Sequence, residues 1–356
     1  MYGIRMLRGG KHPIYGLPFS GSVHNRLREE WRAKLFRRRW RMMRKALQRD
    51  LGIFLSGQAR LCVERAPTAA RKVLWLFNWT TLGDSVMDLA ARDSIPTHVR
   101  LDLCIAPALA GLYAGEPRFG AVFSRIEDCD GDYDFVVIHE LSSHSLAEKR
   151  RRLPAVPFAP ALNYMIGEHF DRTAFVDARI RHLFELPTAP PPVPRLRLDA
   201  PPAGSQGSFQ VAVALGARDP RRAFASWDAV LRELLSTWPA DRRPIRFLLL
   251  GTAGAGHDLA GLCADVLRHC DARIGQTSIV EAAALIRGCA AFIGPDGGLM
   301  HVAAAMGIPG VGLFTQIDPT MRLAAGSSMA AVVGSASMAD ITAAGVTSAF
   351  YRAIGD

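Results

Sequence analysis

Short apolar runs alternate along the chain with stretches that have the apolar spacing of helices. Between several of the runs, apolar positions three and four residues apart predict helices at residues 227–237, 259–269 and 278–287. Strands that alternate with helices imply right-handed crossovers and a parallel sheet, so the sequence predicts an α/β protein. The predicted strands are short enough to be buried in such a sheet, and they lie at residues 73–77, 99–105, 134–138, 210–215, 245–250, 290–293 and 310–314.

A Pro-rich run divides the chain. Residues 187–204 contain seven prolines in eighteen residues, a composition that excludes a helix or a central strand and favours an extended linker. With 356 residues the chain is also longer than one hydrophobic core usually allows. We therefore expect two Rossmann-like α/β domains facing a cleft, the default ligand site. The predicted parts are a basic extension (1–60), the N-terminal domain (61–186), the linker (187–204) and the C-terminal domain (205–356).

The positive charge is concentrated near the N-terminus. The chain has 43 Lys and Arg against 33 Asp and Glu, a net charge of +10. Residues 26–50 contain eleven of the basic residues and three acidic ones, so the rest of the chain is close to neutral. The apolar spacing predicts a helix at residues 27–47. Two interpretations of it stay open, a helix on an anionic membrane surface and a solvated helix that packs its aromatic residues on the first domain, with nucleic-acid binding third.

Several classes of protein are excluded by what the sequence lacks. No apolar run approaches the ~18 residues that a membrane-spanning helix needs, and the first twenty residues have no apolar core typical of a signal peptide. The six cysteines are scattered without a C-x-x-C pair, which favours reduced thiols and argues against a zinc site. We expect a cytoplasmic protein, with peripheral contact to the inner face of the inner membrane as the alternative that the basic extension raises.

The stretch 290–319 contains the most informative candidate site. A predicted strand ends near residue 293, and the Gly-rich turn Asp296-Gly297-Gly298 leads into an Ala-rich helix. The first turn of a helix has unpaired N–H groups and the positive end of the helix dipole, so it binds phosphate, and glycine allows close backbone approach. Asp296 would repel a phosphate, so we expect it to accept a hydrogen bond from a ribose or sugar hydroxyl. The alternative is a tight turn with a capping Asp.

The same residues resemble a known family. Asp296-Gly-Gly-Leu-Met-His301-Val-Ala-Ala-Ala-Met-Gly-Ile-Pro, followed by Leu313-Phe314, is similar to the donor motif of the glycosyltransferase family 9 heptosyltransferases, which have the GT-B fold. Gly275-Gln-Thr277-Ser278 resembles their Gly-x-Thr-Ser loop, and Glu281 completes a capping box with Ser278. Leu82-Gly83-Asp84-Ser85-Val86 resembles the Gly-Asp loop that supplies their catalytic carboxylate. The stretch from Val213 to Ala217, with Arg222, resembles their Pro-Gly-Ala loop with its Lys, and the resemblance covers about 71–319.

The resemblance implies an inverting, metal-independent transfer of a heptose-like sugar from a nucleoside diphosphate, ADP-heptose, to a lipid-linked saccharide. It implies no cofactor or metal. Asp84 is the expected base on its loop, with an N-cap of a helix near Ser85 as the alternative. The expected donor-binding residues are Gly216, Ala217, Arg222, Thr277, Ser278, Asp296, Gly297, Gly298, Met300 and His301. The sequence departs from the family at Gly297, Leu215, Arg222 and Thr315-Gln316, where the family usually has Thr, Pro, Lys and Gly-Pro.

Other basic and histidine-containing stretches are weaker candidates. His139-Glu-Leu-Ser-Ser-His144 has its histidines five residues apart, which does not fit the H-E-x-x-H zinc motif. Lys149 and Arg150, with Arg37, Arg38 and Arg39 of the extension, are expected to contact an anionic acceptor or membrane. No nucleic-acid partner is expected. Two other functions stay open, transfer of heptose to a protein Ser and a non-catalytic GT-B-like module that binds a partner or nucleic acid through residues 26–49.

Overall fold

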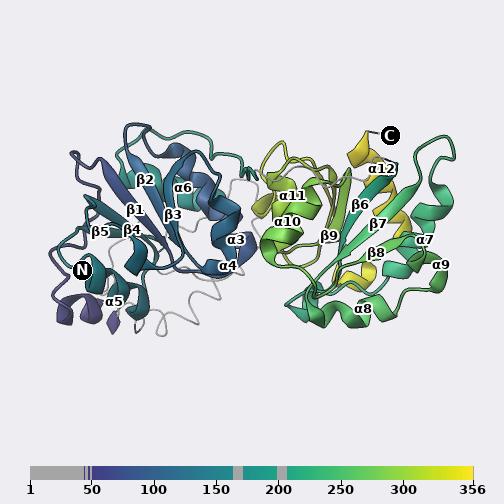
Figure 1. The fold of residues 1–356 in the computed structure, drawn as a ribbon, viewed down its shortest axis with the longest axis horizontal. Helices are drawn as coiled ribbons and strands as arrows, with labels where there is room; N and C mark the ends of the chain where they lie inside the picture. The colour runs from purple at the N-terminus through teal and green to yellow at the C-terminus, as the bar shows by residue number, and fades with distance from the viewer. Residues whose placement is uncertain (1–43, 45–46, 49, 163–170, 199–206, 356) are drawn as a thin grey trace. The chain divides into compact units, whose positions relative to one another are not determined.

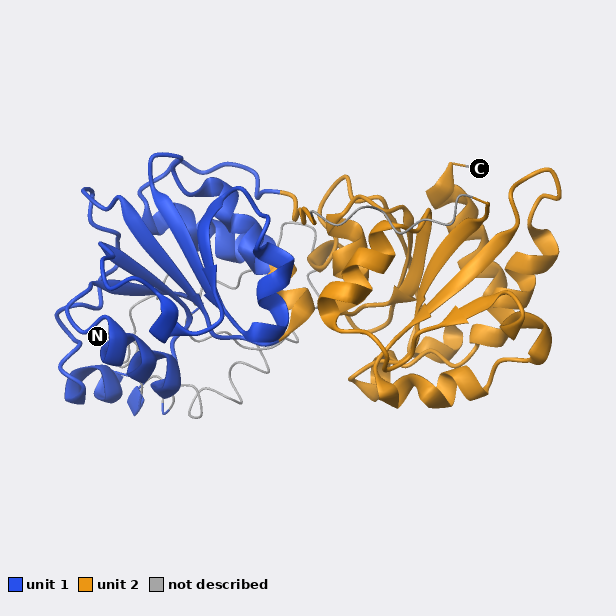
Figure 2. Cartoon of the chain, in the orientation of Figure 1, with its two compact units in different colours: residues 1–80, 88–192 blue, residues 81–87, 193–356 orange. Residues whose placement is uncertain are grey.

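The computed structural model describes residues 44, 47–48, 50–162, 171–198 and 207–355. The chain divides into two compact units, drawn in different colours in Figure 2. Unit 1 comprises residues 1–80 and 88–192, and unit 2 comprises residues 81–87 and 193–356. The segment 81–87 therefore packs with the C-terminal part of the chain. The division predicted at the Pro-rich run had placed this segment in the N-terminal domain. The domain bounds drawn from the sequence stay predictions.

Unit 1 is built on a five-stranded parallel sheet with the order β3-β2-β1-β4-β5. The central strand β1 pairs on both sides, with Val73 opposite Leu101 of β2 and opposite Phe135 of β4. A strand in this position is covered on both faces, which explains why its sequence is apolar without alternation. The strands are β1 (Lys72–Phe77), β2 (Arg100–Ile105), β3 (Phe119–Phe123), β4 (Phe135–Glu140) and β5 (Phe158–Leu162).

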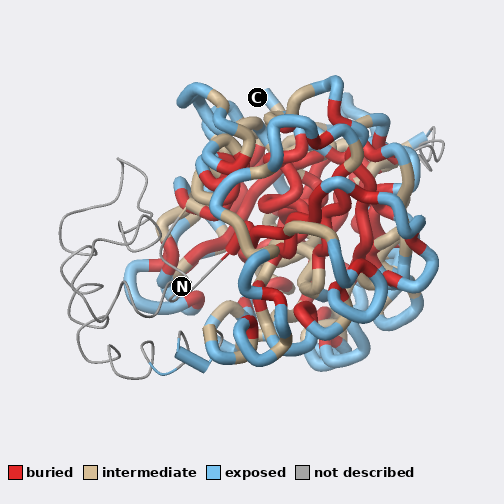
Figure 3. The backbone as a smooth tube through the Cα atoms, turned by 90° about the vertical axis from the view of Figure 1, so that its left-hand side faces the viewer, coloured by how far each residue is buried: buried red, intermediate tan, exposed pale blue. Residues whose placement is uncertain are grey.

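Helices α4 (Pro107–Tyr113), α5 (Ser143–Arg152) and α6 (Arg172–Leu183) belong to unit 1, and α3 (Leu82–Asp88) follows β1. One apolar cluster joins strands β1 and β4 to the inner face of α5, through Leu146 and Leu153. Helix α5 begins with a capping box in which the Ser142 hydroxyl accepts from the Ser145 N–H. Strands β1, β2, β4 and β5 are buried along almost their whole length, whereas β3 is only partly buried. Figure 3 shows buried residues in the interior and exposed residues at the surface.

Unit 2 has a six-stranded parallel sheet with the order β11-β10-β9-β6-β7-β8. The strands are β6 (Phe209–Ala214), β7 (Ile245–Leu250), β8 (Cys270–Ala272), β9 (Ala291–Pro295), β10 (Gly310–Phe314) and β11 (Met329–Val333). The chain passes from β6 outward through β7 to β8 and then returns to the other side of β6 with β9. The topology therefore reverses between β6 and β9, the place in an open α/β sheet where ligands bind beyond the carboxyl ends of the strands.

Helices cover both faces of the unit 2 sheet (Figure 1). On one face, α7 (Trp227–Thr237), α9 (Ala264–Leu267) and α12 (Ala343–Ile354) enclose the main apolar cluster together with the inward residues of the strands. On the other face, α10 (Ile279–Arg287) packs against α11 (Gly298–Ala305), and α11 packs against β9. The short helix α8 (Gly256–Ala260) precedes α9. This two-faced cover is typical of a doubly wound sheet.

The structure confirms the α/β class and all seven predicted strands, with ends shifted by two residues or fewer. Four strands were not predicted, namely β3, β5, β8 and β11. β8 has three residues and β11 is exposed at alternate positions, so neither forms a continuous apolar run. The helix predicted at 259–269 is wrong in part, because the chain turns at Gly261 and divides it into α8 and α9. The helix predicted at 27–47 lies almost wholly outside the described residues.

All six cysteines are free thiols. Burial raises the pKa of the Cys62 and Cys270 thiols to about 11, so both are protonated at neutral pH. Among the described residues, none of the helices has the length and apolar character to cross a bilayer. The same residues contain no group of three or more His, Cys, Asp or Glu placed to hold a metal ion.

Candidate active site

Asp84 lies in the first turn of helix α3 and not on a loop. The helix begins at Leu82, so the expectation that Asp84 caps a helix starting near Ser85 is wrong. The Thr81 hydroxyl donates a hydrogen bond of 2.6 Å to Asp84 Oδ2, which holds the carboxylate in one orientation. Sequence reasoning did not single out Thr81, although a Thr three residues before an Asp at a helix start is a recognisable capping pattern.

The first turn of α3 packs tightly against the start of α11, within unit 2. A Cβ atom added to Gly83 would lie 2.8 Å from the His301 ring, and one added to Gly298 would lie 2.9 Å from the Leu82 side chain. Glycine is therefore needed at both positions because the neighbouring side chains leave no space for a Cβ atom, and not because of the backbone conformation. The packing brings the segment that contains Asp84 next to the helix start predicted to bind the donor.

The predicted donor-binding residues follow the carboxyl ends of β6, β8 and β9. Gly216, Ala217 and Arg222 follow β6, Thr277 and Ser278 follow β8, and Asp296 to His301 follow β9. Gly216 has a φ of +75°, and a Cβ atom there would lie 2.9 Å from that of Ala255, so glycine is needed for both reasons. The residues from β6 and β9 lie at the reversal point of the sheet, where a nucleotide is expected.

Asp296 is the centre of this cluster and is 5% exposed. Its Oδ2 lies 3.2 Å from Arg222 Nη1 and 3.8 Å from Arg322 Nε, and its Oδ1 lies 3.4 Å from His301 Nε2. Burial alone would raise the pKa of Asp296, but the hydrogen bond from His301 and the charges of Arg222 and Arg322 outweigh it, and the pKa is lowered. Asp296 is therefore an ionised carboxylate held among positive groups.

The Asp296 carboxylate retains capacity to accept a hydrogen bond. Its Oδ2 is buried, and among the described residues it has ion-pair neighbours but no hydrogen bond. A buried carboxylate oxygen without a hydrogen bond is uncommon and marks a place for a ligand hydroxyl or a water molecule. This geometry fits the expected contact with a sugar or ribose hydroxyl.

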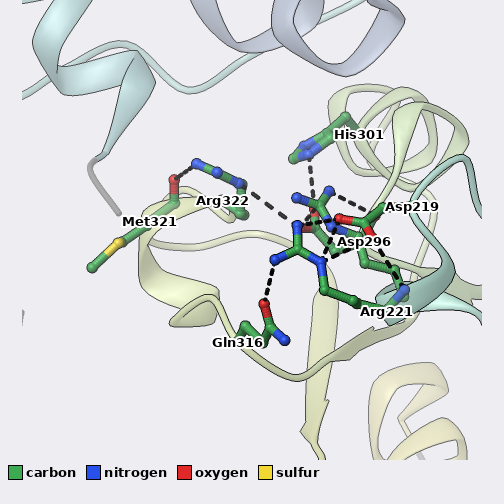
Figure 4. A network of polar contacts seen from close by, with 8 residues as sticks. Asp219, Arg221, Asp296, His301, Gln316, Met321 and Arg322 are labelled. Atoms are coloured by element: carbon green, nitrogen blue, oxygen red, sulfur yellow. Dashed lines mark hydrogen bonds and ion pairs between the residues drawn. The ribbon is translucent and has the colours of Figure 1, made fainter. Parts of the chain in front are cut away.

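Arg322 and Gln316 belong to the same network and were missed by sequence reasoning (Figure 4). Arg322 follows the short helical turn Pro319–Met321, and its side chain is 7% exposed. Gln316, one of the departures from the family pattern, accepts a hydrogen bond of 3.0 Å from Arg221 Nη1, and Arg221 also pairs with Asp219. Single arginines in a loop have no sequence signal, so only the fold could reveal them.

Two predicted donor-binding residues have structural roles, Ser278 as a helix cap and Met300 as a core side chain. The Ser278 hydroxyl accepts from the Glu281 N–H, and Glu281 accepts from the Ser278 N–H at 2.8 Å, which confirms the predicted capping box of α10. Met300 is fully buried, with its sulfur close to Gly312 of β10. Its side chain is part of the core, so the expectation that it touches the donor is corrected.

Lys149 also differs from its predicted role. It is fully buried, donates a hydrogen bond of 2.6 Å to Gln58 Oε1, and lies over the Phe158 ring. Burial lowers its pKa from 10.5 to about 8. A buried lysine cannot contact an acceptor or a membrane, because α5 turns this side chain inward. Arg150 is exposed as expected, whereas Arg37, Arg38 and Arg39 lie outside the described residues.

Unit 1 has a buried ionic cluster that the sequence did not predict. Arg172 Nε lies 2.9 Å from Asp88 Oδ1, its Nη2 contacts Asp88 Oδ2, and His139 Nε2 donates to the same carboxylate at 2.9 Å. Arg172 also lies over the Trp79 ring. His139, rejected as a metal ligand from its spacing, is instead a fully buried partner of Asp88.

A hollow of about 350 Å³ within unit 2 borders the cluster around Asp296. Its wall includes His301 and Arg322 together with Arg195 and Arg197, which come from the segment after the prolines. The hollow extends the basic surroundings of Asp296 to residues that the family motifs do not include.

The Gly297 position permits a direct test of one departure from the family. Gly297 is the N-cap of α11 without a side-chain hydrogen bond, its φ of −169° suits any residue, and an added Cβ atom has its nearest neighbour at 3.5 Å. Gly297→Thr should therefore change the free energy of unfolding by only a few tenths of a kcal/mol and raise nucleotide affinity by up to about tenfold through the added hydroxyl. Gly298→Ala is the contrast, because its Cβ atom would clash with Leu82. Equal behaviour of the two variants in thermal unfolding and calorimetry would contradict this.

Comparison with known proteins agrees with the motifs. Residues 225–342 match the model of glycosyltransferase family 9 (heptosyltransferase). The fold is similar to a family 9 glycosyltransferase from Veillonella parvula, with a TM-score of 0.63 at 13% identity over 82% of this chain and 99% of that one. It is also similar to E. coli ADP-heptose lps heptosyltransferase II, with a TM-score of 0.62 at 18% identity over 80% of this chain and 98% of that one.

E. coli heptosyltransferase WaaC, solved with ADP, has a TM-score of 0.58 at 15% identity over 78% of this chain and 98% of that one. None of the curated proteins matches the chain in sequence. The structures establish the GT-B fold, and the family model covers the helix start and the Asp296 turn described above. The chain therefore has the GT-B fold, and its residues 225–342 are similar to the glycosyltransferase family 9 (heptosyltransferase) model.

Proposed function

We propose that the chain transfers a heptose-like sugar from ADP-heptose to a lipopolysaccharide-type acceptor, with inversion at the sugar carbon and without a metal. The observation that carries the donor site is the buried Asp296 carboxylate among Arg222, Arg322 and His301 at the start of α11. The positive groups and the helix start suit a diphosphate, and Asp296 suits a hydroxyl of the same ligand. We propose ADP-heptose as the donor because one similar structure was solved with ADP and another is named for ADP-heptose.

Each group has a defined part in the proposed reaction. Asp84 takes the proton of the acceptor hydroxyl while its oxygen forms a bond to C1 of the donor sugar. The bond between C1 and the diphosphate oxygen breaks, and its electron pair leaves with the nucleoside diphosphate. Arg222 and the N–H groups at the start of α11 stabilise the charge that develops on this leaving group. The close approach of Gly83 to His301 supports the proposal, because the proposed base and the proposed leaving-group site belong to segments that pack on each other.

Calorimetric titration of ADP, GDP and UDP, each with and without Mg²⁺, tests the donor site. We expect ADP to bind best, with the same affinity in both conditions. Arg222→Ala should weaken ADP binding by about 10- to 100-fold, because a charge-assisted hydrogen bond to phosphate contributes about 1.5–3 kcal/mol. Arg232→Ala is the matched control, since Arg232 is an exposed arginine of the same unit that pairs with Asp228 on α7.

The outcomes separate the competing functions. Equal loss in Arg222→Ala and Arg232→Ala would mean that the effect is not local to the site. Binding that needs Mg²⁺ would overturn the metal-independent mechanism but keep a nucleotide-binding enzyme. If none of the nucleotides binds, the donor site fails and a non-catalytic module that acts through residues 26–49 takes its place. The acceptor class stays a prediction that assays with lipid-linked and protein acceptors would decide. The cytoplasmic location also stays a prediction.

A further inference from the structure

Four large apolar side chains gather on one exposed helical segment near the start of the described chain. Residues 47, 48 and 50–55 are helical, and Leu47, Leu51, Phe54 and Leu55 are 38%, 55%, 65% and 73% exposed. Their spacing of i, i+4, i+7 and i+8 puts them on one side of the helix, and we call them the apolar stripe. The other large apolar residues that the structure describes as exposed, Val193, Leu267 and Val333, lie far apart in the sequence of unit 2.

The opposite side of the same helix is fastened to unit 1. Ile53 is 6% exposed and belongs to the apolar cluster that contains Leu146 of α5 and Leu153, which follows this helix. The helix ends before Gly57, which has a φ of +72°, and Gln58 then donates to the Pro154 carbonyl at 3.0 Å. The buried Lys149 donates to Gln58 from α5. The segment is therefore held firmly, and the apolar stripe faces away from its support.

The sequence at the start of the stripe is basic. Arg44 is exposed and lies three residues before Leu47 in the sequence, and Arg150 is exposed on α5, the helix to which the segment is fastened. In the sequence, residues 26–50 contain eleven basic residues, Arg44 included, against three acidic ones. An exposed apolar stripe beside concentrated positive charge is typical of helices that lie in the interface of an anionic bilayer. A protein partner of neutral surface would satisfy the apolar stripe but not the charge.

We propose that the apolar stripe inserts into the headgroup region of an anionic lipid bilayer, while Arg44 contacts the lipid phosphates. The helical segment thereby docks unit 1 on the membrane surface. This deepens the proposed function, since a lipid-linked acceptor lies in a membrane. The link between docking and the acceptor rests on the proposed function, whereas membrane binding itself does not. Membrane binding and nucleotide binding use different residues in different units, so each can fail without the other.

Flotation of the full-length protein with lipid vesicles tests the docking surface. Vesicles of phosphatidylglycerol and phosphatidylcholine are compared with vesicles of phosphatidylcholine alone, each at low and high NaCl. The variant is Leu51→Gln/Phe54→Gln/Leu55→Gln, which changes only exposed side chains and should keep the fold. The matched control is Leu267→Gln/Val333→Gln, which removes exposed apolar side chains from unit 2. Calorimetry with ADP on every variant reports the donor site separately.

We expect the wild type and the control to bind the anionic vesicles and the stripe variant to bind them about tenfold or more weakly, because three apolar side chains no longer leave water. High salt should weaken binding in all three, and vesicles of phosphatidylcholine alone should bind less protein. ADP affinity should be unchanged by the stripe variant. Equal vesicle binding by the stripe variant and the wild type would overturn the proposal, as would a wild type that binds neither vesicle. Self-association that disappears in the stripe variant, without vesicle binding, would assign the stripe to a second copy of the chain and also overturn it.

Discussion

Asp84→Asn should lower the rate of sugar transfer by about 10²- to 10⁴-fold, the usual contribution of a positioned general base. The asparagine keeps the size of the side chain and its position in the first turn of α3, but it cannot take a proton from the acceptor hydroxyl. The Thr81 hydroxyl at 2.6 Å should still hold the side chain in place. The measurement is the single-turnover rate with the nucleotide sugar that calorimetry selects, together with ADP affinity, which should be unchanged.

Two further variants separate chemistry from structure. Asp93→Asn changes an exposed carboxylate five residues after Asp88 and should transfer sugar at the wild-type rate. Thr81→Val removes the hydroxyl that orients Asp84 and should slow transfer less than Asp84→Asn does. If Asp84→Asn kept the wild-type rate, Asp84 would not be the base.

Asp88→Ala should destabilise unit 1 by about 3–5 kcal/mol, because it leaves the Arg172 guanidinium buried without its carboxylate. Asp88 is fully buried and Arg172 is 5% exposed, and the two form a two-point ion pair with a hydrogen bond from His139. Urea unfolding followed by circular dichroism and tryptophan fluorescence measures the loss, and Trp79 lies directly beneath Arg172. The matched control is Asp93→Ala, because the Asp93 side chain is 40% exposed and lies 3.8 Å from Arg92 Nε, so this ion pair should contribute no more than about 1 kcal/mol.

The acid dependence of stability should change in the same variant. Burial alone would raise the pKa of Asp88, but the charge of Arg172 and the hydrogen bonds from His139 and Arg172 outweigh it, and the pKa is lowered. The stability that this carboxylate contributes is present above the pKa of an unfolded Asp, about 3.9, and is lost as the pH falls through the lower folded value. Asp88→Ala should therefore unfold with a flatter pH dependence below about pH 4.

Replacing the whole pair, Asp88→Leu/Arg172→Met, should recover part of the free energy of unfolding that Asp88→Ala loses.

If Asp88→Ala cost no more than Asp93→Ala, the buried ion pair would not be what stabilises this part of unit 1. If the double variant were less stable than Asp88→Ala, the separation of Arg172 from its carboxylate would not be the cause of the destabilisation.

Much of the fold could be predicted from the sequence because the central strands are covered on both faces and must be apolar along their length. This is the reason that β1, β7 and β10 were located to within a residue or two. Edge strands lack this signal, since β8 and β11 are partly exposed and pair on one side only. The break between α8 and α9 also has no apolar signal, because both pieces continue the same spacing.

The sequence by itself determined the parallel α/β class, the family resemblance and the local motif at Asp296, since these depend on apolar periodicity and on short-range turns and caps. Only the tertiary structure decided which side chains meet. It brought Arg322 to Asp296, joined Asp88 to His139 and Arg172, and turned Lys149 and Met300 inward. The physical reason is that burial and ion pairing depend on how distant segments pack, and a charged residue has the same letter in the sequence whether it faces water or a core.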